Sequence, residues 1–165
     1  MANHSYNTTF IYGPEEDLKR LSDRVDTTRG LLNSLYPMPD GMDDIDEMSW
    51  AITNWSTKWE IDCWQSPTGP DQIVYVYTTA WGAPAHFWKN VSAQFPTLRF
   101  ITTFHVPGVA VGGQAHANGE MLTDIYIEEE DENNGEKMLD MVYTRLQVHT
   151  QLANKLVEMV KGGAL

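Results

Sequence analysis

The sequence predicts a single α+β domain in which an antiparallel sheet packs against helices. Segments with the two-residue periodicity of strands alternate along the chain with segments that have the spacing of amphipathic helices. Glycine, proline and asparagine separate these segments, as is typical of turns. The chain has 165 residues, of which 42% are hydrophobic, so it can bury one sizeable core and is small for two.

The first strand is expected at residues 5–12, which are rich in β-branched and aromatic side chains and precede a glycine–proline pair. A helix should follow, because Pro14 suits a first helical turn and the three acidic residues after it favour the positive end of the helix dipole. Leu18, Leu21 and Val25 give this helix its apolar stripe.

The middle of the chain is expected to form a loop and then a hairpin. Residues 30–49 contain prolines, a glycine and an acidic stretch, which predict a loop with one short helical turn. Side chains in residues 58–64 alternate between one side expected to be buried and one expected to face solvent, as in a strand. They should pair with residues 72–81, a nearly continuous β-branched and aromatic run typical of a central strand.

A second helix and three strands complete the predicted sheet. The helix is expected between Pro84 and Pro96, with apolar residues spaced for packing on a sheet. Residues 97–106 alternate again, and two further strands at 109–117 and 122–128 are joined by an asparagine–glycine turn signal. The order strand, helix, strand, strand, helix, strand is the split βαβ, ferredoxin-like arrangement.

The last segment, residues 135–161, is expected to form one long helix with an apolar stripe. At a rise of roughly 1.5 Å per residue it would be about 40 Å long, which is longer than is required to cover a small sheet. It should therefore either cover the open face of the sheet or pair with a second copy in a homodimer. Residues 1–128 form the expected ferredoxin-like domain, and residues 129–165 add an acidic loop and this helix to the same globular unit.

The predicted fold class is therefore a ferredoxin-like antiparallel sheet with two helices on one face, an added hairpin strand and a long C-terminal helix. Several short motifs in the chain resemble those of the Api92-like domain proteins of phages and mobile elements. These motifs lie at residues 2–7, 35–39, 54–59, 79–84, 94–96, 107–108 and 118–120.

This resemblance covers roughly residues 1–122 and implies a ferredoxin-like fold, but no established activity and no catalytic residues. The chain departs from the family at His4-Ser5-Tyr6, where Trp-Cys is usual, and at Ser56, where glycine is common. The whole chain also resembles, more closely, a T4-type bacteriophage protein of unknown function, which implies action in the host cytoplasm.

Charge and composition exclude several classes of partner. The formal charge of −12 repels phosphate backbones, so direct binding to nucleic acid is not expected. The apolar runs are too short to cross a bilayer, so no membrane partner is expected. Cys63 is the single cysteine, which prevents an intrachain disulfide and fits a reducing cytoplasm. An acidic surface usually serves solubility, but it can also compete for a basic groove on a partner.

No motif in the sequence indicates a catalytic, cofactor or metal site. The five histidines lack the close spacing of a zinc finger or a metalloprotease helix, so no metal is expected. His105 and His116 lie on strands predicted to be neighbours and are the best two candidates if a histidine site exists.

The aromatic residues are the stronger candidates for binding. Trp55 and Trp64 occupy predicted loop or outward positions and could contact a partner or anchor a loop. The tyrosines of the central strand, together with Arg99, are expected to share the open sheet face and to offer a stacking platform for a base, unless a covering element makes them core. The candidate binding residues are Trp55, Trp64, Tyr75, Tyr77, Trp81, Arg99, His105 and His116.

Three functions follow in order of preference. The first is a non-enzymatic phage accessory protein that binds and modulates a host factor, one with a basic surface, through an acidic, aromatic-containing surface. The second is a protein that binds a small ligand or nucleotide on the open sheet face. The third is a small hydrolase with a histidine and carboxylate site.

Overall fold

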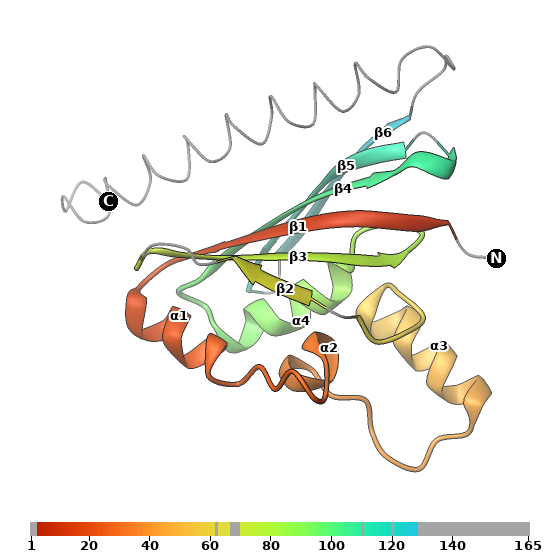
Figure 1. Cartoon of the computed structure of the whole chain (residues 1–165), viewed down its shortest axis with the longest axis horizontal. Coiled ribbons are helices and arrows are strands. Elements are labelled where there is room, and N and C mark those ends of the chain that lie inside the picture. Colours follow the sequence, from red (N-terminus) through yellow and green to blue (C-terminus); the bar gives the residue numbers. More distant parts are fainter. Residues whose placement is uncertain (1–2, 62, 67–69, 110, 120, 129–165) are drawn as a thin grey trace.

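Six strands form one antiparallel sheet in the computed structural model, which describes residues 3–61, 63–66, 70–109, 111–119 and 121–128 (Figure 1). Within the sheet the strands lie in the order β2-β3-β1-β4-β5-β6. The strands are β1 (His4–Tyr12), β2 (Cys63–Ser66), β3 (Gln72–Ala80), β4 (Arg99–Val106), β5 (Val111–Asn118) and β6 (Met121–Glu128).

The order β2-β3-β1-β4 confirms the ferredoxin-like α+β fold. Strand β1 lies between β3 and β4 and is antiparallel to both, as the split βαβ arrangement requires. The predicted hairpin of β2 with β3 is confirmed. Strands β5 and β6 extend the sheet beyond β4, and Gly119 adopts a φ of +61° at the turn where the sequence predicted a hairpin.

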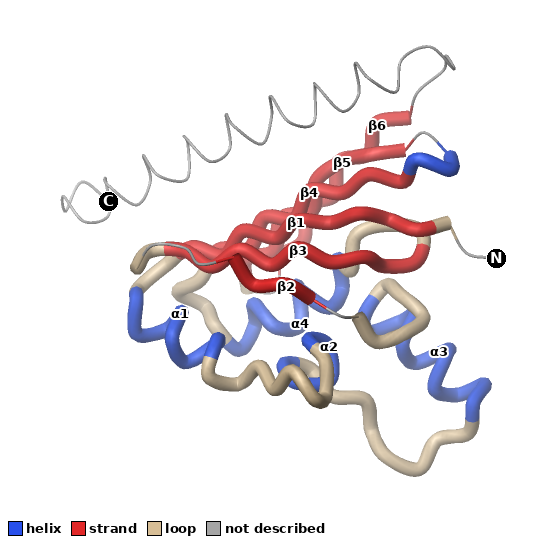
Figure 2. The backbone as a smooth tube through the Cα atoms, in the orientation of Figure 1, coloured by secondary structure: helices blue, strands red, loops and turns tan. Residues whose placement is uncertain are grey.

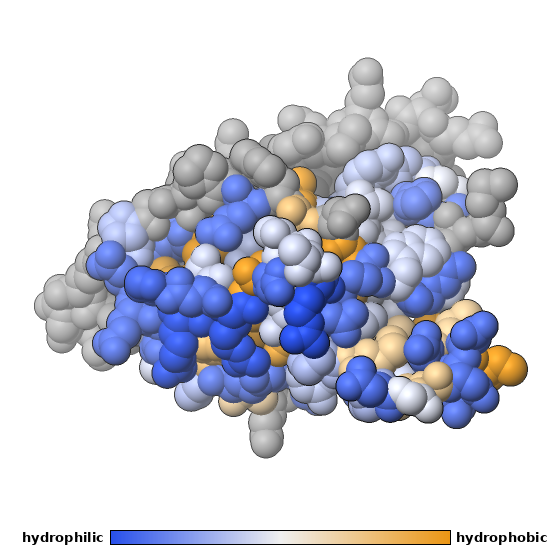
Figure 3. Space-filling model, turned by 60° about the horizontal axis from the view of Figure 1, so that its bottom comes forward, coloured by the Kyte–Doolittle hydropathy of each residue, from blue (hydrophilic) through white to orange (hydrophobic). Residues whose placement is uncertain are grey.

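Helices lie on one side of the sheet in the described part of the chain (Figure 2). Figure 3 views the molecule from this side, where hydrophilic residues cover much of the surface. These helices are α1 (Glu15–Ser22), α2 (Leu31–Leu35), α3 (Asp44–Trp55) and α4 (Ala85–Gln94).

The prediction of a loop with one short helical turn at residues 30–49 is wrong in part: α2 is such a short helix, but the first half of α3 also lies there. The carboxylate of Asp43 accepts hydrogen bonds from the backbone N–H groups of Ile45 and Asp46, which makes it an N-cap. The acidic residues that follow occupy the first turn of α3, where the helix dipole favours negative charge. The acidic stretch therefore starts a helix and does not belong to the predicted loop.

The strand expected at residues 58–64 is also displaced, since β2 begins at Cys63. The segment before it turns inward at Glu60, whose carboxylate accepts hydrogen bonds from three backbone N–H groups. Its oxygens lie 2.9, 2.7 and 2.8 Å from the nitrogens of Leu32, Asn33 and Ile61. These bonds fix the segment against the start of α2, where a Cβ on Gly30 would meet the Glu60 side chain at 2.5 Å.

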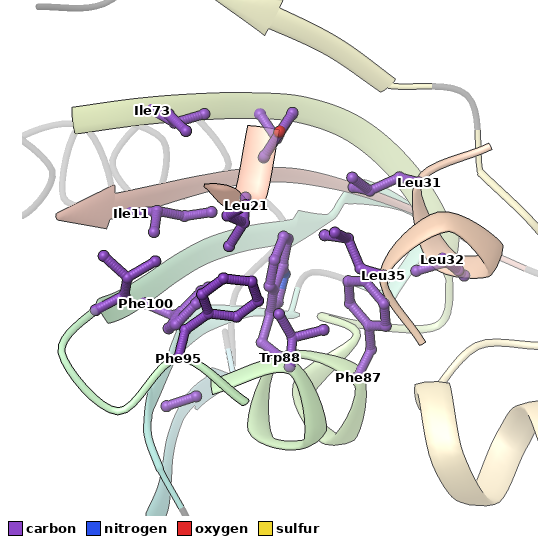
Figure 4. Packing of buried hydrophobic residues seen from close by; sticks show 14 of the residues in the cluster. Ile11, Leu21, Leu31, Leu32, Leu35, Ile73, Phe87, Trp88, Phe95 and Phe100 are labelled. Carbon is purple, nitrogen blue, oxygen red and sulfur yellow. The ribbon is translucent and has the colours of Figure 1, made fainter. Parts of the chain in front are cut away.

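The main core lies between the sheet and the helices, with Trp88 of α4 at its centre (Figure 4). The Trp88 ring lies 4.7 Å from the Phe87 ring and 5.4 Å from the Phe100 ring, centroid to centroid. Its Nε1 donates a hydrogen bond to the hydroxyl of Tyr77. A smaller cluster around Phe104 packs near the start of α4.

A buried polar chain crosses the covered face of the sheet. The hydroxyl of Thr9 lies 2.6 Å from that of Tyr77 and 2.7 Å from that of Thr102. Next to it, Asn7 donates from Nδ2 to the hydroxyl of Thr79. Because each of these groups has a partner, the sheet can bury polar side chains without a large desolvation cost.

The predicted C-terminal helix at residues 135–161 lies outside the described residues, as does the acidic loop before it. The expected division at residues 128 and 129, and the homodimer through this helix, therefore remain predictions. Among the described helices, none is both long and apolar enough to cross a bilayer.

Candidate functional site

Trp55 is a core residue, which corrects the expectation that it lies at an outward loop position. It is the last residue of α3, it is 1% exposed, and its Nε1 donates to the backbone oxygen of Tyr36. Trp64 lies on β2 opposite Val76, and its side chain is outside what the structure describes.

The predicted stacking platform is wrong, because its residues lie on opposite faces of the sheet. Tyr75 and Tyr77 are buried beneath the helices and share that face with Thr9 and Thr102. Arg99, His105 and His116 occupy the other face, as the strand register requires.

Arg99, on the face away from the described helices, is engaged with its own chain, since its guanidinium donates to Asn118 Oδ1 at 2.7 Å. Trp81 lies on neither face: it follows the end of β3 and is 48% exposed.

His105 and His116 lie on adjacent strands but not side by side. His116 pairs with Ile101, which is four residues from His105 along β4. At roughly 3.3 Å per residue, the two positions are about 13 Å apart along the sheet. This spacing is too long for both imidazoles to bind one metal ion or to act on one bond. In the described part of the chain, no group of three or more histidine, cysteine or acidic residues is placed to hold a metal ion.

The structure instead presents an apolar stripe on α3. Ile45, Met48 and Ile52 are 75%, 48% and 41% exposed, and their i, i+3, i+7 spacing places them along one side of the helix. In Figure 3 this appears as tan and orange surface over α3, toward the lower right. The signal was present in the sequence as an aspartate N-cap with an acidic first turn, which precedes this helical spacing.

Acidic side chains surround this stripe, and the sequence segment that carries them contains no lysine or arginine. No lysine or arginine occurs between Arg29 and Lys58 in the sequence. The segment carries five carboxylates, Asp40, Asp43, Asp44, Asp46 and Glu47. We call the stripe Ile45, Met48 and Ile52, together with these five carboxylates, the α3 surface.

A groove of about 500 Å³ opens beside the α3 surface and shares four of its residues, Asp40, Asp44, Glu47 and Met48. Trp55 and Trp59 contribute aromatic lining, and Glu60 contributes a wall whose carboxylate is already satisfied by backbone N–H groups. The full lining is Asn33, Met38, Pro39, Asp40, Gly41, Asp44, Glu47, Met48, Trp55, Lys58, Trp59 and Glu60.

One end of the groove carries a cluster that we call the aromatic corner: Lys58, Trp59 and Trp81. The Lys58 ammonium lies 4.7 Å from the centroid of the Trp59 ring and 5.3 Å from that of the Trp81 ring. The corner joins residues 54–59 and 79–84, which are far apart in the sequence and carry two of the motifs described above.

Unusual backbone geometry fixes this corner. In the described part of the chain, the non-glycine residues with positive φ are Ser56 at +60° and Trp81 at +69°. Ser56 ends α3 in the left-handed region, and its hydroxyl accepts a hydrogen bond from the His86 N–H at the start of α4. The Trp81 N–H donates to the Asn3 carbonyl oxygen at 2.9 Å. Such geometry costs free energy and persists only where neighbouring contacts hold it.

Together, the α3 surface, the groove and the aromatic corner offer apolar side chains, carboxylates and aromatic rings on one continuous region. This chemistry suits a partner that is both apolar and positively charged.

Comparison with known proteins adds a family and a fold. A family model described as the ferredoxin-like domain in Api92-like protein matches residues 44–145. The chain is also similar to a solved structure, the protein api92 from Yersinia pseudotuberculosis, with 12% sequence identity and a TM-score of 0.43. That match covers 61% of this chain and 36% of the length of the Yersinia protein. No curated protein matches the chain.

Proposed function

Because the chain belongs to the family of Api92-like proteins with a ferredoxin-like domain, a membership that gives a fold and no reaction, we propose a function in binding. The protein is a non-enzymatic accessory protein of a T4-type phage. It binds and modulates a host factor in the cytoplasm of the infected cell. The binding region is the α3 surface with its adjoining groove, and the partner presents a basic, partly apolar surface.

The observation that carries this proposal is an exposed apolar stripe set in an acidic segment that lacks cations. Burial of a fully exposed isoleucine or methionine side chain contributes roughly 1.5–3 kcal/mol, and these three side chains, 41–75% exposed, can each gain a part of that. The three residues of the stripe can therefore supply a substantial part of a binding free energy. The five carboxylates would attract a basic partner and repel a second copy of the same surface, so self-association through α3 is disfavoured.

The two alternative functions have less support. A nucleotide on the open sheet face would have to bind without Tyr75 and Tyr77, which the helices cover. A hydrolase built on His105 and His116 would need both imidazoles at one bond, and the strand register separates them.

Affinity purification from phage-infected cells tests the proposal. The bait is the full chain, compared with an Ile45→Ser/Ile52→Ser double variant and with Val109→Ser. Val109 is 51% exposed and lies outside the α3 surface, so it controls for the loss of an exposed apolar side chain. A host protein captured by the bait is then purified and its affinity measured at low and moderate salt.

We expect the double variant to bind this host protein at least about tenfold more weakly than the unchanged chain, because interface anchors typically contribute more than 1 kcal/mol each. Val109→Ser should bind normally, and moderate salt should weaken binding because exposed charge contacts are screened. Equal binding by the double variant and the control would show that α3 is not the interface. Circular dichroism of both variants checks that the fold is retained.

A further inference from the structure

The aromatic corner places one of the chain's own cations between two tryptophan rings. Lys58 lies within the roughly 6 Å range of cation–π attraction from both Trp59 and Trp81. Trp81 is 48% exposed, so the outer side of this slot is open to solvent.

The cation in the slot is held by its contacts with the two rings. Among the described residues, no carboxylate forms an ion pair with Lys58, although Asp40, Asp44 and Glu47 line the same groove. A lysine side chain is long and flexible, and its ammonium is strongly hydrated, so it can leave an aromatic slot for solvent at small cost.

The backbone at Trp81 and the ring of Trp59, in contrast, each have a supporting contact. Trp81 is held at a φ of +69° by the hydrogen bond from its N–H to Asn3. Trp59 packs against the His4 ring, with the centroids 6.1 Å apart. Two neighbouring rings whose cation has no ion-pair partner among the described residues have the form of a binding site that its own side chain occupies in the free protein.

We propose that the aromatic corner receives an arginine guanidinium of the basic partner, and that Lys58 gives way to it. A planar guanidinium can stack on tryptophan faces and is more weakly hydrated than an ammonium, so it is the better occupant. The acidic residues of the adjoining groove favour a cation over a phosphate or carboxylate at this position. The inference rests on the proposed function, since it names the side chain by which the partner is recognised.

A titration with a blocked tripeptide that has a central arginine tests this site directly, with the citrulline tripeptide as an uncharged control. Binding is followed by NMR through the indole N–H signals of Trp59 and Trp81. The variants are Lys58→Met, which removes the cation from the slot, and Trp81→Gly, which removes one ring. Glycine tolerates the positive φ at this position, so the second variant should not strain the fold.

We expect Lys58→Met to bind the arginine probe roughly two- to twentyfold more tightly than the unchanged chain, because no internal cation must be displaced. Adding Trp81→Gly should remove this gain, and citrulline should bind neither protein measurably. Weaker or unchanged binding by Lys58→Met would overturn the proposal, as would equal binding of citrulline. This outcome is separate from the test of the α3 surface: if the stripe variants lose the host protein while Lys58→Met gains nothing, only the arginine slot is wrong.

Discussion

At the scale of single residues, Glu60 shows how one side chain can shape the candidate site. Its carboxylate accepts three backbone hydrogen bonds, two of them from the start of α2. Glu60 was expected on the solvent-facing side of a strand, but it lines one wall of the groove instead. Sequence periodicity placed Glu60 in solvent, because a local pattern does not show which distant backbone N–H groups will donate to its carboxylate.

We predict that Glu60→Gln lowers the free energy of unfolding by roughly 1–2 kcal/mol, because an amide has one acceptor oxygen where the carboxylate has two, and hydrogen bonds to charged groups are the stronger ones. Urea denaturation measures this change. Glu16→Gln, on the exposed first turn of α1, is the matched control. If both variants were equally stable, Glu60 would have no special part in holding α2.

At the scale of elements, α3 is the clearest case in which the chain formed a structure that we did not predict. Prolines and acidic residues upstream favoured a loop, whereas the Asp43 N-cap and the acidic first turn stabilise a helix. The apolar residues of α3 were then divided by packing: Ala51 and Trp55 face the core, and the stripe faces solvent.

Asp43→Ala should destabilise the protein by roughly 0.5–2 kcal/mol, since the first N–H groups of α3 lose their acceptor. Asp43→Asn should be close to the unchanged chain, because asparagine is an equally good N-cap. Amide hydrogen exchange at residues 44–47 locates the effect, and urea denaturation gives its size. Similar exchange in the alanine and asparagine variants would show that the cap does not stabilise α3.

At the scale of the whole molecule, burial of tyrosine hydroxyls links the stability of the fold to alkaline pH. Burial raises the pKa of Tyr77 to about 12, against the opposing effect of its hydrogen bonds with Thr9 and Trp88. Burial likewise raises the pKa of Tyr75. Since an unfolded tyrosine has a pKa of about 10, the folded chain keeps these protons to higher pH than the unfolded chain does.

The tyrosine contribution to stability should therefore be fully present below pH 10 and be lost as the pH rises toward about 12. Urea denaturation at several pH values between about 8 and 11.5 measures this slope, which spans the unfolded tyrosine pKa. Tyr77→Phe should show a shallower fall in stability with pH than the unchanged chain, because it lacks one of the titrating groups. Identical slopes would mean that Tyr77 ionises as easily in the fold as outside it.

The sequence by itself determined the ferredoxin-like sheet, α1, α4 and the turn at Gly119. These features depend on local patterns: alternation along a strand, apolar spacing along a helix, and a residue that tolerates positive φ. They could be predicted because each involves residues that are close in the chain.

Only the tertiary structure decided which face of the sheet the tyrosines take and where the candidate site lies. Alternation shows that a strand has two faces, but it does not show which one the helices cover, so Tyr75 and Arg99 were wrongly placed together. The position of Lys58 between Trp59 and Trp81 likewise depends on the packing of two segments that are distant in the sequence. Long-range contacts of this kind depend on how the whole domain packs. A local sequence pattern contains no information about them.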